Sequence, residues 1–218
     1  MENKEYKLRE EIKNFQIKTY ICDINIYSDN INQPLVLCKG NVDIKDNGSS
    51  VMISDIIESK GTNRIFENGN IVVSNYNVIS SNGVTIVNGR EVTDDEIDNI
   101  ELIIPKKQRN CSIFVKNISG DTSVSDLKLF RFVLETVGGD ISLKNFDSIH
   151  SLIKTVGGDV DIEVLESMLN YDVDANTLCG DKIQRSIEKE SPILLDCKNY
   201  LRINTVSGDI KVLFKGKH

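Results

Sequence analysis

The most conspicuous chemical feature of this sequence is a pair of glycines followed by an aspartate. Residues 136–141 read Thr-Val-Gly-Gly-Asp-Ile, residues 155–160 repeat the pattern, and residues 205–210 carry it with serine in place of the first glycine. Backbone amides of a glycine-rich loop can hold a phosphate, and a neighbouring carboxylate can ligate a metal ion. Recurrence argues against such a site and favours a structural role that is used several times.

Two weaker copies extend the series, and their spacing predicts a stack of coils. Residues 117–122 read Asn-Ile-Ser-Gly-Asp-Thr and residues 177–182 read Thr-Leu-Cys-Gly-Asp-Lys, so that successive motif glycines lie 19, 19, 22 and 28 residues apart. A period of roughly 20 to 50 residues is typical of solenoids and other repeat arrays. The glycine suits a corner that needs a positive φ, and the aspartate can accept hydrogen bonds from backbone amides. We therefore interpret the motif as one corner per coil.

The threonine that opens the motif shares the parity of the predicted inward-facing residues. Hydroxyl groups stacked at successive corners can bond along the stack and satisfy buried polar groups. The pattern therefore predicts a structural ladder rather than a row of nucleophiles. Its members are Thr136, Thr155, Thr177 and Thr205, with Asn117 in the first copy.

Two pairs of aspartates have the spacing for hydrolytic chemistry. Asp159 and Asp161 lie two residues apart on one face of a predicted strand, and so do Asp172 and Asp174. Parallel β-helices host carbohydrate-active enzymes, which use paired carboxylates on a solvent-facing surface. The alternative is that Asp159 is a corner residue and Asp161 its solvated neighbour. Because no nucleophile elbow, phosphate loop or His-containing triad is present, we predict no catalytic residue and expect a protein that is not an enzyme.

Candidate metal ligands are sparse. Residues 93–99 are acidic and begin with a capping-box pattern, but they lack the glycine and the ligand spacing of an EF-hand loop. The cysteines are scattered without a CxxC pair, which argues against zinc and indicates buried thiols in a reducing compartment. We expect no metal-binding or cofactor-binding residue and no cofactor; whether the loop or the aspartate pairs bind a cation stays open. The cysteines are Cys22, Cys38, Cys111, Cys179 and Cys197, and the histidines are His150 and His218.

Short β-strands must position these residues, because apolar and polar residues alternate around each Gly-Asp step. Stacking such coils about 4.8 Å apart pairs equivalent strands in parallel and merges the apolar positions into one core. In the fourth coil Lys182 and Gln184 occupy apolar positions, and residues 186–192 form a charged insertion. This pattern predicts that the segment bulges out as a loop, or that its register slips by one residue and turns Ile183 inward. The predicted core positions are Ile113/Val115, Phe132/Leu134, Ser151/Ile153, Val173/Ala175 and Leu201/Ile203 before the corner, and Val124, Leu143, Ile162 and Val212 after it.

The N-terminal half predicts further strands and hairpins that cap one end of the stack. Residues 1–14 are charged and predict a short helix or a frayed leader, whereas residues 15–26 predict one strand with a bulge at Cys22-Asp23. Asn-Gly steps at 68–69, 82–83 and 88–89 predict tight antiparallel hairpins. Residues 100–104 predict a strand that ends at Pro105.

These patterns together predict an all-β protein, with a right-handed parallel β-helix or solenoid of about five C-terminal coils. We expect a charged leader over residues 1–14 and a single domain over residues 15–218. Within that domain, residues 15–105 would form the strands and hairpins and residues 106–218 the Gly-Asp coils.

Composition limits the partners. The chain of 218 residues has 26 basic and 33 acidic residues, a formal charge of −7, and a longest basic cluster of four residues at 106–109. Nucleic-acid binding needs clustered Lys and Arg, so we expect none. No apolar run approaches the roughly 20 residues of a membrane helix, and no signal peptide is recognisable. We therefore expect no direct membrane insertion and a cytoplasmic location.

With these motifs in view, the chain resembles the bacterial putative-adhesin family of β-solenoid proteins. The resemblance rests on the recurrent Thr-x-Gly/Ser-Gly-Asp-Ile steps, on Ile103-Ile104-Pro105 before the first coil, and on residues 15–26 and 83–89. It implies an adhesin-like role, with surface display as the alternative location, and it implies no catalytic residues.

Three functions follow as hypotheses. The first is a non-enzymatic adhesin-like solenoid that binds or scaffolds a protein or glycan partner. The second is a self-assembling cell-envelope or cytoskeletal scaffold, a homo-oligomer formed through the solenoid ends. The third is a carbohydrate-active β-helix enzyme.

Overall fold

The computed structural model describes residues 3–39, 42–55, 98–186 and 199–216, and strand residues 66–67, 70–71, 78–81, 84–87 and 90–92 of the segment between. The chain divides into two compact units, Met1–Asp55 with Asp98–His218, and Ile56–Ile97. Every described element except one short 3-10 turn (Met168–Asn170) is a β-strand. The expected all-β class is confirmed, whereas the single domain expected over residues 15–218 divides between these units.

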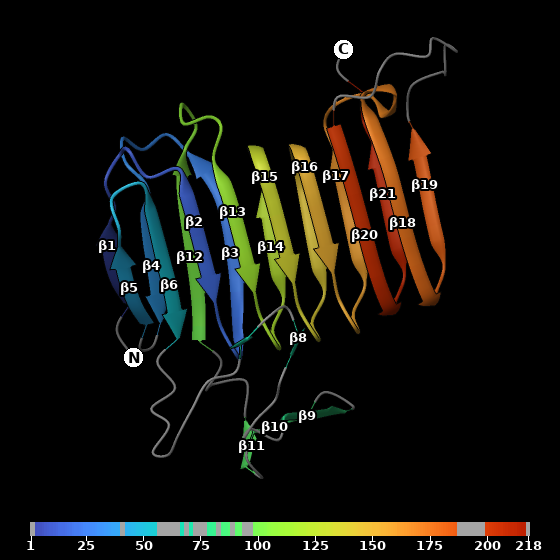
Figure 1. Cartoon of the computed structure of the whole chain (residues 1–218), viewed down its shortest axis with the longest axis horizontal. Coiled ribbons are helices and arrows are strands. Elements are labelled where there is room, and N and C mark those ends of the chain that lie inside the picture. The colour runs from blue at the N-terminus through green and yellow to red at the C-terminus, as the bar shows by residue number, and fades with distance from the viewer. Residues whose placement is uncertain are drawn as a thin grey trace. The chain divides into compact units, whose positions relative to one another are not determined.

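The larger unit contains sixteen strands in one hydrogen-bonded network (Figure 1). They are β1 (Asn3–Lys7), β2 (Asn14–Lys18), β3 (Cys22–Asp29), β4 (Leu35–Lys39), β5 (Val42–Asp46), β6 (Ser50–Asp55), β12 (Asp98–Pro105), β13 (Ser112–Lys116), β14 (Thr122–Ser125), β15 (Lys128–Glu135), β16 (Ile141–Lys154), β17 (Val160–Val164), β18 (Tyr171–Cys179), β19 (Lys182–Ser186), β20 (Asn199–Ser207) and β21 (Ile210–Phe214).

Six pairs of strands, each joined by one corner, repeat along this unit, and we call each pair a rung. Equivalent strands of neighbouring rungs pair in parallel and form two ladders. Ladder 1 runs β2-β13-β15-β16-β20-β18, and ladder 2 runs β3-β14-β16-β17-β21-β19. β16 belongs to both ladders because the chain turns at Asn145, whose φ is 49°.

The last two rungs are exchanged relative to their order in the chain. β20 and β21 pair directly with β16 and β17, and β18 and β19 pair with the far side of β20 and β21. The repeat pattern of the sequence does not indicate this exchange. The fourth coil of the sequence is instead the end of the stack, and the fifth lies inside it.

The core lies between the two ladders, and the predicted phase of the strands is confirmed. Ile113 pairs with Phe132 and Val115 with Leu134, as the alignment on the Gly-Asp step requires. The inward rows of the first five rungs of the stack are almost entirely inaccessible to solvent, whereas Val173 and Ala175 in the end rung are only partly buried. Each buried aliphatic or aromatic side chain contributes roughly 1.5–3 kcal/mol. Phe132 and Phe146 meet edge to face across the core, with ring centroids 5.3 Å apart.

Antiparallel strands close the N-terminal end of the stack. β5 pairs with β6, and β1 pairs with β4, which pairs in turn with β12. The helix or leader expected over residues 1–14 is wrong: β1 is an edge strand, and Leu8 and Ile12 behind it are buried in the core. Burying these two side chains requires an ordered segment, which the charge pattern alone does not reveal.

The smaller unit contains the hairpins that the Asn-Gly steps predict. β7 (Phe66–Glu67) pairs antiparallel with β8 (Asn70–Ile71), and β10 (Val84–Val87) pairs with both β9 (Val78–Ser81) and β11 (Arg90–Val92). In each hairpin two residues separate the paired strands, which is the commonest hairpin connection.

At the other end of the stack, β18 and β19 have no further neighbour among the described strands. Lys182 and Gln184 are in register with the buried Ile210 and Val212, so their side chains lie on the core side of an open edge. The expected one-residue slip is therefore wrong, and Ile183 stays on the outside; the loop expected at residues 186–192 falls almost entirely outside the described residues. Inward-facing charged and polar residues on an edge strand discourage pairing with a second chain. The fourth coil departs from the pattern because it is the cap.

We predict that apolar residues at positions 182 and 184 allow the edge strand β19 to pair with a strand of a second molecule. Lys182→Ile with Gln184→Val should raise the share of larger species above that of the wild type in sedimentation velocity. The matched control is Arg185→Val, which changes the outer side of the same strand and should leave the sedimentation of the protein unchanged. A double variant that sediments like the wild type would contradict the protective role of Lys182.

Candidate functional site

The Gly-Asp corners form a continuous hydrogen-bond ladder along one edge of the rungs. In each corner, the aspartate Oδ1 accepts a hydrogen bond of 2.8 or 2.9 Å from the backbone N–H of the aspartate in the next rung. Because the acceptor is charged, such bonds are stronger than neutral ones. The acceptor-to-donor order along the stack is Asp23, Asp121, Asp140, Asp159, Asp209 and Asp181.

The motif glycines lie directly against the carbonyl groups of the preceding corner. Gly158 has φ +99°, and a Cβ atom added to it would lie 2.2 Å from the carbonyl oxygen of Gly139. The equivalent distances at Gly120, Gly139, Gly180 and Gly208 are 2.2 or 2.3 Å. The glycines are therefore required by the approach of protein backbone, and this space holds no phosphate.

The threonines of the motif act within their own corners. The Oγ1 hydroxyls of Thr136, Thr155 and Thr205 each donate to the carbonyl oxygen two residues further along the chain, at 2.8, 2.5 and 3.0 Å. Two predicted members reach the neighbouring rung: Thr177 donates to the Gly208 carbonyl oxygen, and Asn117 donates to the Cys22 carbonyl oxygen at 2.9 Å and accepts a hydrogen bond from Thr19 at 3.0 Å. The predicted structural role is right, and the predicted bonding along the stack is confirmed for Thr177 and Asn117 but wrong for the other three.

The first corner of the stack is a sixth copy of the motif, which the Gly-Asp pattern of the sequence did not reveal. Residues 19–24 read Thr-Tyr-Ile-Cys-Asp-Ile, and Asp23 begins the aspartate ladder. The strand predicted over residues 15–26 is thus two strands with a corner between them. Cys22 stands at the glycine position because this is the first corner of the ladder, and it is Gly120 of the next corner that abuts its carbonyl oxygen. Thr19 and the step Asp23-Ile24 have the spacing of the motif and could have revealed this corner.

We predict that the two adjacent glycines of one motif respond very differently to a methyl group. Gly158→Ala should lower the free energy of unfolding by at least about 3 kcal/mol, because the residue is strained and collides with backbone. Gly157→Ala should cost less than about 1 kcal/mol, because its Cβ would lie 3.7 Å from the nearest of these atoms, the Val137 carbonyl oxygen. Urea unfolding of both variants measures the difference, and equal losses would contradict the close-approach argument.

The aspartate ladder predicts a contrast between two substitutions at one position. Asp140→Ala should cost about 1–2 kcal/mol of unfolding free energy, because the N–H of Asp159 loses its acceptor. Asp140→Asn keeps an oxygen at Oδ1 and should cost about half as much or less. Thermal or urea unfolding compares them; a loss as large for asparagine as for alanine would mean that the negative charge itself is required.

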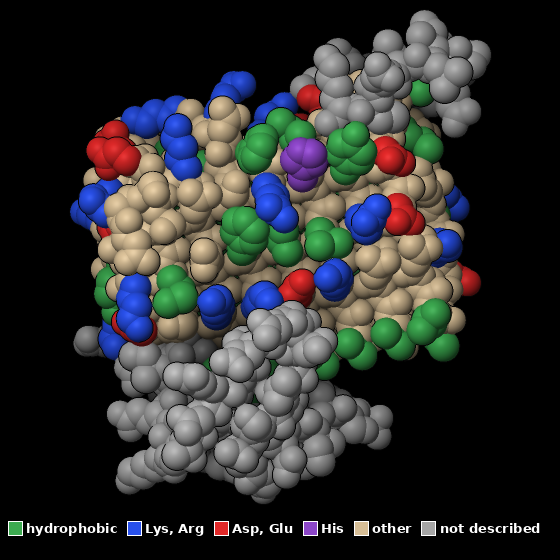
Figure 2. Space-filling view, in the orientation of Figure 1, with side chains coloured by type: hydrophobic (Ala, Val, Ile, Leu, Met, Phe, Trp, Pro, Cys, Tyr) green, Lys and Arg blue, Asp and Glu red, His purple; other side chains and the backbone are tan. Residues whose placement is uncertain are grey.

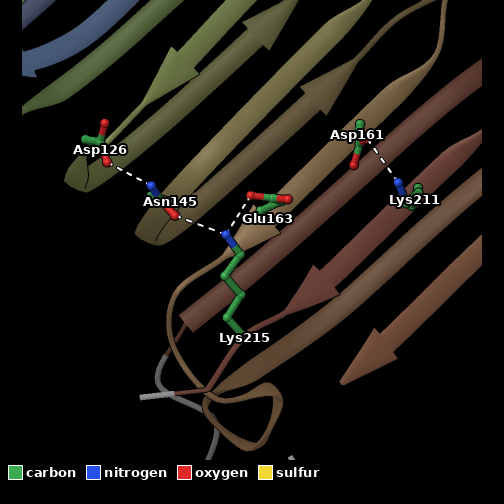
Figure 3. Close-up of polar contacts among 6 residues, drawn as sticks. All are labelled: Asp126, Asn145, Asp161, Glu163, Lys211 and Lys215. Carbon is green, nitrogen blue, oxygen red and sulfur yellow. Dashed lines mark hydrogen bonds and ion pairs between the residues drawn. The ribbon is translucent and has the colours of Figure 1, made fainter. Parts of the chain in front are cut away.

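Most carboxylates on the outer face of ladder 2 are engaged by neighbouring side chains (Figure 3). Asn145 donates to Asp126 at 2.9 Å, and Lys215 bridges Asn145 at 3.2 Å and Glu163 at 2.7 Å. Asp161 lies 3.3 Å from Lys211. Asp159 is a corner residue of the aspartate ladder, so Asp159 and Asp161 do not form a free carboxylate pair.

The outer face of ladder 1 carries a row of exposed aromatic side chains, which we call the aromatic row. It consists of Phe130, His150 and Tyr200, of which Phe130 and Tyr200 are 45% and 49% exposed. The rings of His150 and Tyr200 stack 5.5 Å apart at 8°, and Phe130 meets His150 edge-on at 5.8 Å. Figure 2 shows hydrophobic side chains gathered around a histidine on this face. Exposed rings held by mutual stacking are typical of binding surfaces.

A shallow groove of about 250 Å³ lies beside this row. Val133 and Leu152, on neighbouring strands, line it together with His150 and Tyr200. Arg131 also lines it, and its guanidinium carbon lies 5.4 Å from the centre of the Phe114 ring. Among the residues described, Arg131 has no carboxylate partner.

The second predicted aspartate pair lines the same groove. Asp174 binds the Nε of Arg202 at 3.2 Å and accepts a hydrogen bond from Asn176 at 2.7 Å. Asp172 lies beside Tyr200 in register and has no hydrogen-bond partner in the part of the chain that the structure describes. The structure therefore separates the two predicted pairs, one on each outer face, and brings only Asp172 and Asp174 to a groove.

The register explains how these residues meet. Arg131, His150, Asp172 and Tyr200 each lie nine residues before a motif aspartate, and this equal offset places them side by side across four strands. The alignment on the Gly-Asp step predicted only the inward positions. The same alignment applied to the outward positions would have predicted that these four residues lie side by side.

Ladder 1 presents a positive outer face in a negatively charged protein. The three outward rows in register with Arg131, Val133 and Glu135 carry five cations and three carboxylates between β2 and β18, a net charge of about +2, whereas the whole chain carries −7. Glu135 lies 3.0 Å from Lys116 and 3.4 Å from Lys154; burial works to raise the pKa of Glu135, but these two lysines outweigh it and lower the pKa. The five cations are Lys18, Lys116, Arg131, Lys154 and Arg202; the carboxylates are Glu135, Asp172 and Asp174.

Two buried groups with shifted pKa values lie away from the groove and have packing roles. Burial raises the pKa of the Cys111 thiol to about 11, so it stays a neutral apolar side chain. Burial also raises the pKa of Tyr171 to about 12, where its hydroxyl oxygen accepts a hydrogen bond from the Ser148 N–H at 3.1 Å. Cys22 and Cys38 are buried as predicted, whereas Cys179 is exposed.

Within the described ranges, no three His, Cys, Asp or Glu side chains are grouped closely enough to hold a metal ion. The acidic loop and capping box expected near residues 93–99 fall largely outside those ranges, as does Cys197. None of the described elements is a helix long and apolar enough to cross a membrane.

Comparison with known proteins places this arrangement in a family. The model of the Toastrack DUF4097 family matches residues 39–218. The chain belongs to the Toastrack DUF4097 family. No curated protein matches the sequence.

Two solved structures extend the comparison of this Toastrack protein. A putative cell adhesion protein from Clostridium sporogenes ATCC 15579 is 11% identical, with a TM-score of 0.57 over 98% of this chain and 99% of that chain. A putative adhesin from Bacteroides fragilis NCTC 9343 is also 11% identical, with a TM-score of 0.34 over 99% of this chain and 96% of that one. The first likeness supports the same fold.

Proposed function

We propose that this Toastrack protein is a non-enzymatic, adhesin-like binding protein whose binding surface is the outer face of ladder 1. The observation that carries the proposal is the aromatic row, exposed and stacked beside a groove that holds Arg131, which has no carboxylate partner among the described residues. Aromatic and arginine side chains dominate the energetics of many recognition surfaces. The name of the Clostridium protein of similar fold agrees with such a role.

A binding role accounts for the carboxylates better than hydrolysis does. Asp159 and Asp161 are engaged by a backbone N–H and by Lys211. Asp174 is neutralised by Arg202, which leaves Asp172 without a second free acid beside it. Glycoside hydrolysis needs one carboxyl group as an acid and another as a base or nucleophile, so a lone free carboxylate favours binding.

We further propose that the rungs wind as a right-handed solenoid, the hand that parallel crossover connections adopt in nearly all proteins. The solenoid then serves as a rigid support for the binding face. Self-assembly through the ends is the weaker alternative, because antiparallel strands close one end and Lys182 and Gln184 guard the other.

The test measures binding of the purified protein to a panel of immobilised glycans and extracellular-matrix proteins by surface plasmon resonance. Phe130→Ser with Tyr200→Ser should raise the Kd of any specific partner by at least tenfold, because the aromatic row then loses two of its three rings.

The matched control is Val156→Ser with Val206→Ser, two corner residues that are each 45% exposed. This control should leave the Kd within about twofold of the wild-type value. Equal losses in both double variants, or binding that survives removal of the rings, would overturn the assignment of the surface.

A further inference from the structure

We infer that the groove on ladder 1 binds a carboxylate-bearing glycan, such as a uronic-acid or sialic-acid residue. This inference rests on the proposed binding function and names its ligand class. It follows from three features of the groove: an apolar floor, exposed aromatic rings along one side, and two arginines that carboxylates of the described residues do not fully satisfy.

The floor and the rings match the apolar side of a sugar ring. Val133 and Leu152 are flanked by the longer side chains of His150 and Tyr200, so a flat ring that settles on them is shielded from water on one face. Sugar rings present C–H groups on their faces and hydroxyl groups around their edges. Contact between these C–H groups and an aromatic ring removes the apolar surface of both from water, which favours binding.

The polar residues of the groove match the edge of the same ring. Asp172 offers a carboxylate acceptor for hydroxyl donors, and Arg202, whose Nε lies 3.2 Å from Asp174, adds a second guanidinium to the groove. Arg131 lies two strands away from Arg202, about 10 Å across the ladder. A guanidinium without a carboxylate partner is suited to bidentate binding of a ligand carboxylate.

The size and charge of this face select among acidic ligands. A groove of about 250 Å³ is small for a folded epitope but is open along the face, so a chain of sugars can pass through it. The row of Lys116, Glu135 and Lys154 beside the groove adds further positive charge. Long-range attraction by this local charge favours polyanionic chains, although the whole protein is negative.

The experiment measures binding of three probes by isothermal titration calorimetry: a hexamer of galacturonic acid, sialyllactose, and a neutral galactose hexamer. At least one acidic probe should bind at least tenfold more tightly than the neutral hexamer. Arg131→Gln should weaken that binding by about tenfold or more, because a charge-assisted pair is lost. Lys144→Gln, which changes an exposed lysine on ladder 2, should leave it unchanged. The probe that binds identifies whether the carboxylate comes from a uronate or from a sialate.

Two results would overturn the inference. One is equal affinity for neutral and acidic probes, or acidic binding that Arg131→Gln leaves intact. The other is no binding of acidic glycans at millimolar concentration while a protein partner still depends on Phe130 and Tyr200. In that second case the binding face stands and only its ligand class is wrong. Loss of both kinds of binding would count against the proposed function as well.

Discussion

The closeness of successive corners is the constraint on which the rest of this structure depends. Parallel strands in neighbouring rungs must lie about 4.8 Å apart, and the chain must turn within that spacing at every corner. Only a residue without Cβ fits there, since the carbonyl oxygen of the previous glycine lies 2.2 Å from the place that a Cβ would occupy. The aspartate that follows then binds the next backbone N–H and fixes the register. This contact therefore sets the register of the strands in both ladders.

Because the strands are in register, equivalent outward residues of successive rungs form one continuous surface. Residues at one offset from the corner form a straight row on the outside of ladder 1, so His150 and Tyr200 stack although 50 residues separate them in the chain. Paired strands on both sides hold the backbone beneath each ring. A surface of this kind loses little conformational entropy when a ligand binds, which favours affinity without deep burial.

The phase of the strands could be predicted from the sequence, because alternation and the glycine position are local properties. The inward positions around Ile113 and Phe132 followed directly from it. The order of the last two rungs could not be predicted, because every rung presents equivalent edges and the connections are long enough for either neighbour. The corner at Asp23 was missed for a related reason: Cys22 has no preceding corner to collide with, so the glycine that marks the other corners is absent.

The exchanged order of the last rungs has a consequence for how the polypeptide reaches its native state during synthesis. β18 and β19 leave the ribosome before β20 and β21, yet their backbones pair with the stack through these later strands. Until residues 199–214 have been synthesised, the edge of β16 and β17 lacks the strands that pair with it in the native fold. Nascent chains therefore cannot mature strictly from one end to the other, and premature termination before residue 199 removes the link between the main stack and its cap.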